Sequence, residues 1–221
     1  MDMIAGNIRD ITDKMYRTLE AASRKRDDAT LIAVSKMQPD DKITAALAAG
    51  QRVFGENRVQ EAMARWAHRR QDYPDLQLHL IGPLQTNKVK QVVALFDVIH
   101  TVDRPKLAHA LADEMTRQNR QLTCLIQVNT GDEMQKAGVS VAGLPDLLAL
   151  CHDLALDIRG LMCIPPVDDA PEGHFQMLAD LASRHNLDWL SMGMSDDFEA
   201  ALRCGATHIR VGSRLFGHRS E

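Results

Sequence analysis

The chain has 221 residues, of which 45% are hydrophobic and 25% are charged, and its formal net charge is -4. These values are typical of an ordinary globular protein, and they give no electrostatic reason to expect a nucleic acid or an anionic membrane as a partner. We therefore expect a small-molecule ligand.

The cysteines and the N-terminus bear on the cellular compartment. The four cysteines are scattered, with neither C-x-x-C spacing nor a His/Cys cluster, which predicts reduced thiols in or near the core and no metal site: Cys124, Cys151, Cys163 and Cys204. Residues 1–14 mix acids and bases and lack the apolar segment of a signal peptide, and no run has the length of a membrane span. We expect a cytoplasmic protein with no membrane partner.

The predicted elements begin with an amphipathic helix. Residues 3–25 place apolar side chains at helical spacing with charged residues between them. The apolar run Leu31–Lys36 then predicts a strand, and residues 39–50 open with proline and two acids and close on Gly50, which is typical of a helix. Together these segments predict a first βα unit preceded by an extra N-terminal helix.

The same alternation continues to the end of the chain. Helical patterns separate eight short apolar segments that we predict to be strands: 31–36, 52–56, 76–82, 97–102, 122–129, 156–164, 187–193 and 206–212. Eight such units, with no stretch left for another domain, predict an α/β fold in which residues 1–221 form a single (β/α)8 TIM barrel. The longest irregular stretches, Thr130–Val139 and Pro165–Gly173, are candidate site loops.

Lys36 is the first candidate for chemistry. Most lysines are solvated surface residues, but this one follows an apolar run at a predicted strand end, where barrels keep their functional groups. A partly desolvated amine has a lowered pKa, and the neutral amine attacks aldehydes to form a Schiff base.

Two further stretches follow the second and third predicted strands. In Gly55–Asn57, the glycine allows a close approach to a ligand and Asn57 offers an amide, although Asn57 alone is more typical of a helix N-cap. His79 lies in an apolar strand, where a satisfied core histidine is the commoner case. We retain both Asn57 and His79 as candidate cofactor-binding residues.

The loops after the seventh and eighth predicted strands have the composition of a phosphate site. Barrels commonly bind phosphate at these loops, next to a helix N-terminus. Each loop alone is as typical of an ordinary helix cap, with Ser195 as the capping residue, or of a turn. Their coincidence favours a phosphate site that lies next to the first strand in a closed barrel and so suits a phosphorylated aldehyde on Lys36: Ser191, Gly193, Ser195, Gly212 and Ser213.

Arg210 lies within the eighth predicted strand. A buried arginine is costly unless it is paired, so one interpretation is a salt bridge. The alternative is that Arg210 donates to a ring nitrogen, which would keep a pyridine unprotonated and limit its capacity as an electron sink.

These motifs resemble a known family. The chain is similar to the pyridoxal-phosphate homeostasis proteins (YggS/PROSC family), relatives of the N-terminal barrel of alanine racemase, from the first helix nearly to its end. The resemblance is carried by AVSK, FGENRVQE, HLIGPLQTNK, HTVDR, QVN, GLMCIPP, LSMGMSDDFEAAL and IRVGSRLFG. Departures, such as Leu78 in place of the family's usual tryptophan, remove no proposed ligand.

The resemblance implies that pyridoxal 5'-phosphate is bound as a Schiff base of Lys36. It implies that the phosphate is held by Ser191, Gly193, Ser195, Gly212 and Ser213, that Arg210 approaches the pyridine nitrogen and that Asn57 lies beside the cofactor. It also implies that Lys136, in the loop after the fifth predicted strand, assists cofactor transfer.

A racemase needs a base on each face of the cofactor. Alanine racemase takes its second base, a tyrosine, from another domain of a partner subunit, whereas the only tyrosines here, Tyr16 and Tyr73, fall in the first helix and before the third strand. We therefore expect a monomeric carrier that holds the cofactor and delivers it to apoenzymes, with no catalytic residue. The alternatives are a racemase of low activity and, more remotely, a Schiff-base aldolase acting on a sugar phosphate.

Overall fold

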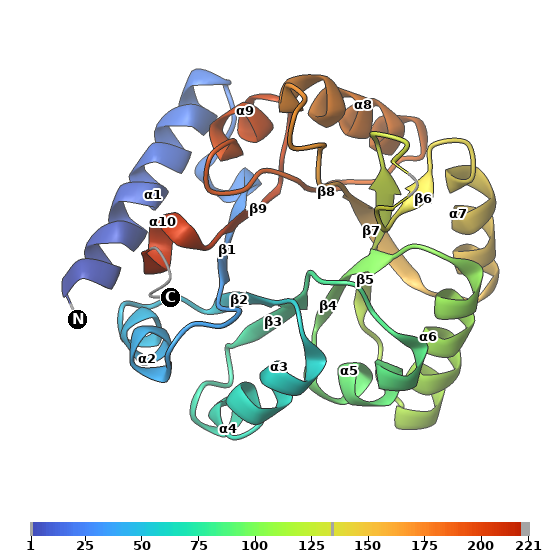
Figure 1. Cartoon of the computed structure of the whole chain (residues 1–221), viewed down its shortest axis with the longest axis horizontal. Helices are drawn as coiled ribbons and strands as arrows, with labels where there is room; N and C mark the ends of the chain where they lie inside the picture. The colour runs from blue at the N-terminus through green and yellow to red at the C-terminus, as the bar shows by residue number, and fades with distance from the viewer. Residues whose placement is uncertain (1, 134, 218–221) are drawn as a thin grey trace.

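The structure is a computed structural model that describes residues 2–133 and 135–217. Eight parallel strands form a closed ring in the order β1–β2–β3–β4–β5–β7–β8–β9, and β9 pairs with β1 (Figure 1). Their bounds are Thr30–Val34, Val53–Glu56, Gln77–Leu80, Val98–Val102, Thr123–Asn129, Asp157–Met162, Trp189–Ser191 and His208–Val211. The predicted barrel is confirmed, and each strand coincides with one of the eight apolar segments.

The helices lie outside the ring of strands (Figure 1). Their bounds are α1 Asp2–Ala21, α2 Asp40–Ala48, α3 Val59–Trp66, α4 Arg69–Asp72, α5 Val89–Leu95, α6 Pro105–Gln118, α7 Leu144–Asp153, α8 Pro171–Arg184, α9 Phe198–Arg203 and α10 Ser213–Phe216. Short 3-10 helices cover Arg26–Asp28 (η1) and Thr86–Lys88 (η2). No helix among the described residues is long and apolar enough to cross a membrane.

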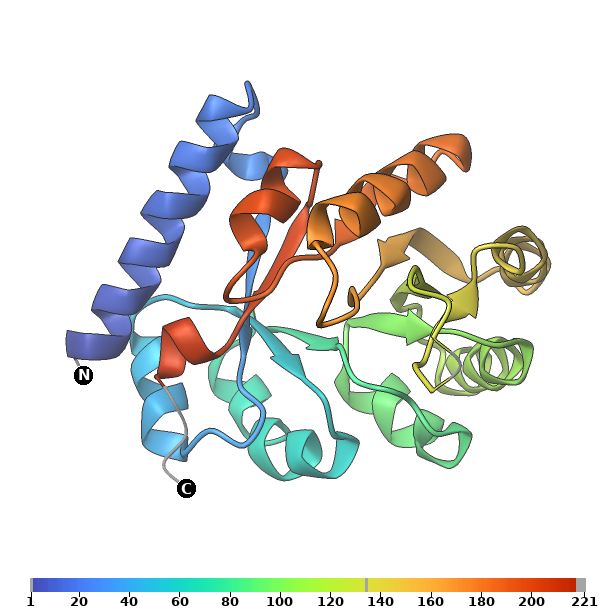
Figure 2. The same ribbon diagram turned by 45° about the horizontal axis from the view of Figure 1, so that its top comes forward.

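The extra N-terminal helix is confirmed. Figure 2 shows α1 lying along the outside of the barrel beside α10 and α9. Ile4, Ile11 and Leu19 are buried on its inner face, and Asn7 donates to the carbonyl oxygen of Leu215, 2.9 Å away. The apolar spacing in the sequence thus becomes the face that α1 buries against the last two helices.

Three differences from the sequence prediction concern the segments after β1, β5 and β7. Strand β1 ends at Val34, so Lys36 lies in the turn that follows, and α8 begins at Pro171, within the stretch predicted to be irregular. A two-residue strand, β6 (Val139–Ser140), pairs with β5 at the end of the other predicted loop. Proline is well placed in the first turn of a helix, which explains the early start of α8.

The core is a continuous apolar layer between strands and helices. All five residues of β4 are buried, as expected for strands covered on both faces. Cys124, Cys151 and Cys163 are buried and Cys204 is half-buried, all four as free thiols. The predicted position of the four cysteines in or near the core is confirmed.

Candidate functional site

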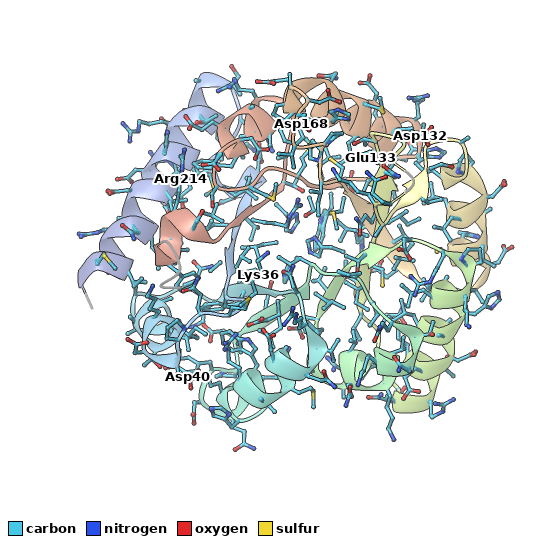
Figure 3. The ribbon with its side chains drawn as sticks, in the orientation of Figure 1. Lys36, Asp40, Asp132, Glu133, Asp168 and Arg214 are labelled. Carbon is cyan, nitrogen blue, oxygen red and sulfur yellow. The ribbon has the colours of Figure 1, made fainter. Side chains whose placement is uncertain are left out.

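The turn after β1 carries Lys36. Ser35 is fully buried, Lys36 is partly buried, and the N–H of Gln38 donates to the carbonyl oxygen of Ser35 at 3.1 Å, which closes the turn. Met37 has a φ of 57°, a left-handed conformation that is uncommon outside glycine. Figure 3 shows Lys36 near the centre of the ring of strands. The amine-bearing residue therefore lies at the carboxyl mouth of the barrel.

A buried carboxylate lies behind this turn. Glu56, the last residue of β2, has no exposed surface. Its Oε1 accepts hydrogen bonds from Ser35 Oγ at 2.7 Å, from Arg65 at 2.7 Å and from Trp66 Nε1 at 2.9 Å. Three donors compensate for the burial of the charge at this oxygen, and they join the ends of β1 and β2 to helix α3.

Asn57 follows Glu56 but is not a helix cap. The N-cap of α3 is Arg58, and Asn57 Oδ1 is buried without a hydrogen-bond partner. Its backbone is held closely against Gly82, where an added Cβ would approach the Asn57 carbonyl oxygen to 2.3 Å. A buried acceptor without a partner is rare, and it marks Asn57 as a residue with capacity for a ligand.

A chain of polar side chains joins strands β3, β4, β8 and β9 across the barrel interior. His79 Nδ1 and His100 Nε2 are hydrogen-bonded at 2.9 Å, and His100 Nδ1 and Ser191 Oγ at 2.8 Å. Arg210 donates to Ser191 Oγ at 2.7 Å and to the carbonyl oxygen of Cys163 at 2.9 Å. Arg210 is 4% exposed, and no described carboxylate lies within ion-pair distance of it. The salt-bridge interpretation of Arg210 is therefore wrong for the described residues.

The histidines of this interior are neutral near pH 7. Burial lowers the pKa of His79 to about 3 and the pKa of His208, whose ring packs on Trp189, to about 4. Burial, followed by the charges of neighbouring histidines and Arg210, also lowers the pKa of His100. His79 Nε2 is buried without a partner, so this ring can still form one hydrogen bond to a ligand or a water molecule.

The loops after β8 and β9 meet at the same end of the barrel. The N–H of Arg210 donates to the carbonyl oxygen of Gly193, and the N–H of Gly212 approaches Ser195 Oγ at 3.4 Å. The N-cap of α9 is Asp197, so Ser195 is not its cap. Gly193 has a φ of 87°, and a Cβ there would approach Ala201 Cβ to 2.5 Å, so the tight turn requires glycine.

The structure thus separates the sequence-predicted residues into groups. Gly193 and Ser195 lie on the loop after β8, and Gly212 and Ser213 are the N-cap and first residue of α10 on the adjoining segment after β9, whereas Ser191 is bonded to Arg210 and His100 inside the barrel. Sequence reasoning missed Arg65 and His100, which look like an ordinary helix-surface arginine and a core histidine. Polar residues within otherwise apolar strands were the only available signal for His100.

Lys136 lies on the loop between β5 and β6. Its ammonium pairs with Glu133 at 2.6 Å and approaches the carbonyl oxygen of Pro165 at 3.4 Å, which joins the two loops predicted to be irregular. Figure 3 shows Glu133 and Asp168 on the side of the rim away from Asp40.

The surface of the described residues has two cavities, and one of them adjoins the candidate site. One of about 590 Å³ adjoins Asn57 and is lined also by Arg58, Leu84, Lys88 and Arg104. The larger, about 650 Å³, lies between α1 and α9 and shares no residue with the candidate site. Because the buried polar groups are at the mouth, we place the chemistry there and not in the larger cavity.

Both tyrosines are remote from the carboxyl mouth. Tyr16 lies in α1 under the guanidinium of Arg26, and Tyr73 precedes β3 under that of Arg52. Residues that precede a barrel strand lie at its amino end. Neither tyrosine is therefore a second base for an amine at Lys36.

Known proteins resemble this chain over nearly all its length. Residues 11–220 match the family model of the alanine racemase N-terminal domain. Pyridoxal phosphate homeostasis proteins of Escherichia coli (strain K12) and Vibrio alginolyticus are 39% and 41% identical, and each match covers 99% of this chain and 98% or 99% of the relative.

Solved structures agree with these relatives. PipY of Synechococcus elongatus PCC7942 with PLP bound has a TM-score of 0.81 and 38% identity, covering 97% of this chain and 100% of PipY. An alanine racemase of Clostridium difficile 630 has a TM-score of 0.72 at 15% identity, covering all of this chain and 58% of that one, which shows a shared fold.

Proposed function

The chain belongs to the family of pyridoxal phosphate homeostasis proteins, and on that premise we propose that it binds pyridoxal 5'-phosphate as a Schiff base of Lys36. We propose further that it stores the cofactor and delivers it to apoenzymes. The observation that carries the proposal is the position of Lys36 at the barrel mouth (Figure 3), after strand β1, which pairs with β2; Asn57, whose buried Oδ1 lacks a hydrogen-bond partner, directly follows β2.

The residues of the mouth fit each part of this cofactor. Lys36 offers an amine for the aldehyde, Asn57 Oδ1 is a buried acceptor without a partner, and the loops of Gly193 and Gly212 offer backbone N–H groups and serine hydroxyls for a phosphate. When bound, the cofactor supplies a reactive aldehyde and a pyridine ring. The donor set of this chain therefore matches a phosphorylated aromatic aldehyde.

Arg210 is the proposed ligand of the pyridine ring of the cofactor. A guanidinium carries five N–H donors, and Ser191 Oγ and the Cys163 carbonyl oxygen accept only two of them. A guanidinium that donates to a ring nitrogen keeps that nitrogen unprotonated, which weakens the ring as an electron sink. Arg210 therefore favours a stored cofactor over fast carbanion chemistry.

The positions of the two tyrosines support the same conclusion. Tyr16 and Tyr73 are the only tyrosines of the sequence, and neither lies at the mouth. A racemase requires proton transfer on both faces of the cofactor. Exchange of the amino-acid α-proton in deuterated water, measured over a panel of amino acids, is expected to be absent or far below ordinary enzymatic rates.

The test of the proposed function is spectroscopic. Wild-type protein mixed with pyridoxal 5'-phosphate should absorb in the visible range, and borohydride should fix the label on Lys36. Lys36→Ala should lose both signals, whereas Lys90→Ala, which changes an exposed lysine on α5, should keep them. Unchanged absorbance in Lys36→Ala would contradict the assignment.

Delivery requires a separate measurement. Loaded protein should activate a PLP-dependent apoenzyme in the presence of a scavenger of free cofactor, and Lys136→Ala tests the proposed part of Lys136 in that transfer. We also propose that residues 1–221 act as a single domain and a monomer, because the proposed ligands lie within one barrel. Sedimentation of the loaded protein as a dimer would contradict the last point.

A further inference from the structure

The four-residue turn Ser35–Gln38 has an unusual external support. Arg65, from helix α3, donates to the carbonyl oxygen of Ser35 at 2.9 Å and to that of Gln38 at 2.9 Å. These two carbonyl groups flank the pair Lys36–Met37. One planar guanidinium therefore holds both ends of the turn that presents the proposed cofactor amine.

The guanidinium is itself fixed in place. Arg65 donates to the buried Glu56 Oε1 at 2.7 Å, and its Nε lies 3.9 Å from Asp40. The same Glu56 oxygen accepts from Ser35 Oγ and from Trp66, whose ring packs on Phe54 with centroids 4.7 Å apart. Because Glu56 is fully buried and the Arg65 side chain is itself only 13% exposed, the guanidinium has little freedom to follow a moving turn.

The turn requires such support because of its backbone. Met37 is 58% exposed and has a positive φ, so its own side chain contributes little packing to hold an uncommon conformation. Conformations of this kind cost about 1–3 kcal/mol and persist when surrounding contacts impose them. The bonds from Arg65 to Ser35 and Gln38 are contacts of that sort.

We propose that Arg65, ion-paired with Glu56, is a positioning residue for the Lys36 amine. This inference rests on the proposed function, in which Lys36 binds the cofactor aldehyde. Arg65 acts through the backbone of the turn and sets where the amine stands relative to the loops of Gly193 and Gly212. A small misplacement of a reacting group lowers a rate by about tenfold to a hundredfold.

The test compares three variants of the full chain. Arg65→Met removes the bonds to the turn, and Arg65→Lys keeps a cation near Glu56 but cannot span two carbonyl groups with a planar fork. Arg69→Met is the matched control, because Arg69 pairs with Asp40 at 3.1 Å and donates a hydrogen bond to the Arg65 carbonyl oxygen, without a hydrogen bond to the turn itself among the described residues. The rate of pyridoxal 5'-phosphate capture, followed by visible absorbance, should fall about tenfold or more in both Arg65 variants and less than twofold in the control.

A second measurement separates positioning from stability and does not depend on the cofactor. In cofactor-free protein labelled by reductive methylation with 13C-formaldehyde, the dimethylamino signal of Lys36, assigned with Lys36→Arg, should shift or broaden in the Arg65 variants and not in Arg69→Met. If the wild type does not capture pyridoxal 5'-phosphate, the proposed function is overturned. The dimethylamino signals still test whether Arg65 positions the Lys36 amine.

Two outcomes overturn the inference. One is capture by both Arg65 variants at the wild-type rate; the other is an unchanged Lys36 signal with a capture loss equal to that of Arg69→Met. If Arg65→Met does not fold because a buried carboxylate lacks its partner, Glu56→Gln/Arg65→Met removes that charge and is read in the same way.

Discussion

The two sides of the barrel mouth bury polar groups by opposite means. On the β1–β2 side, Glu56 is buried as a carboxylate, and one of its oxygens accepts three hydrogen bonds, one from the paired Arg65. On the β8–β9 side, Arg210 is buried with two neutral acceptors, and the histidines behind it lose their charge. An ion pair thus supports the turn that carries Lys36, the proposed cofactor-binding lysine. A neutral hydrogen-bonded chain supports Arg210, the proposed ligand of the cofactor ring.

The difference has a functional meaning. An ion pair with several donors fixes a backbone turn in one place, which suits the attachment of a covalent ligand. A neutral chain behind a single guanidinium leaves that guanidinium with further donors to direct at a ligand. Four predictions, from the largest expected effect to the smallest, test this contrast between the two sides.

Glu56→Ala should have the largest effect on stability. The change leaves the guanidinium of Arg65, whose side chain is 13% exposed, without its close carboxylate partner, and it removes the acceptor used by the Ser35 hydroxyl and the Trp66 indole N–H. Removal of one partner of a buried pair costs about 3–5 kcal/mol. Urea unfolding measures this loss, and Glu61→Ala, at an exposed pair with Arg58, is the control, with an expected change below about 1 kcal/mol. Equal losses of unfolding free energy in Glu56→Ala and Glu61→Ala would show that the buried ion pair does not support the β1–β2 side as described.

Gly193→Ala, on the β8–β9 side, should cause the second-largest loss of stability. The backbone conformation disfavours any Cβ, and the new methyl would lie 2.9 Å from the Phe198 Cα as well as close to Ala201. We expect about 2–3 kcal/mol of destabilisation from conformational strain and overpacking. Gly173→Ala, within helix α8, where nothing lies within 4 Å of the added Cβ, is the control and should stabilise the protein by up to about 1 kcal/mol, because alanine favours a helix more than glycine does.

The neutral histidines should make the protein sensitive to acid. Their folded pKa values, about 3 for His79 and about 4 for His208, lie below the unfolded value of 6.5, so the stability they confer is complete above pH 6.5. This stability is lost as the pH falls from 6.5 toward 4, because the unfolded chain binds protons before the folded chain does. Each histidine lowers the free energy of unfolding by about 1.4 kcal/mol per pH unit in this range.

His208→Gln should reduce that slope by the share of one histidine. Urea unfolding of the wild type and of this variant at pH 7, 6 and 5 measures the slope. An identical slope in the two proteins would show that His208 is not held neutral in the fold.

Ser195→Ala should have the smallest effect. Its hydroxyl makes one long contact, 3.4 Å to the N–H of Gly212, so the free energy of unfolding should change by less than about 1 kcal/mol. If Ser195 also binds the cofactor phosphate, the Kd for pyridoxal 5'-phosphate should rise by about fivefold, measured by absorbance titration. An unchanged Kd would exclude Ser195 from the phosphate site.

Much of the fold was predictable because its signals are local. Each barrel strand is a short apolar run covered on both faces, so Val98–Val102 and its equivalents are recognisable without knowledge of their neighbours. The boundaries were less predictable: Lys36 follows the apolar run directly in sequence, but β1 ends at Val34 because the turn closed by Gln38 begins at Ser35.

The sequence by itself determined the eight-strand alternation, the lysine after the first strand and the glycine–serine loops after the last two, because these depend on residues adjacent in the chain. Only the tertiary structure decided that Arg65 holds the Lys36 turn and that Ser191 joins His100 and Arg210 inside the barrel. Their sequence separations run from 19 to 91 residues for the pairs of Ser191 and reach 30 for Arg65 and Ser35. Closure of the barrel brings such partners together, and no local pattern of residue types specifies it.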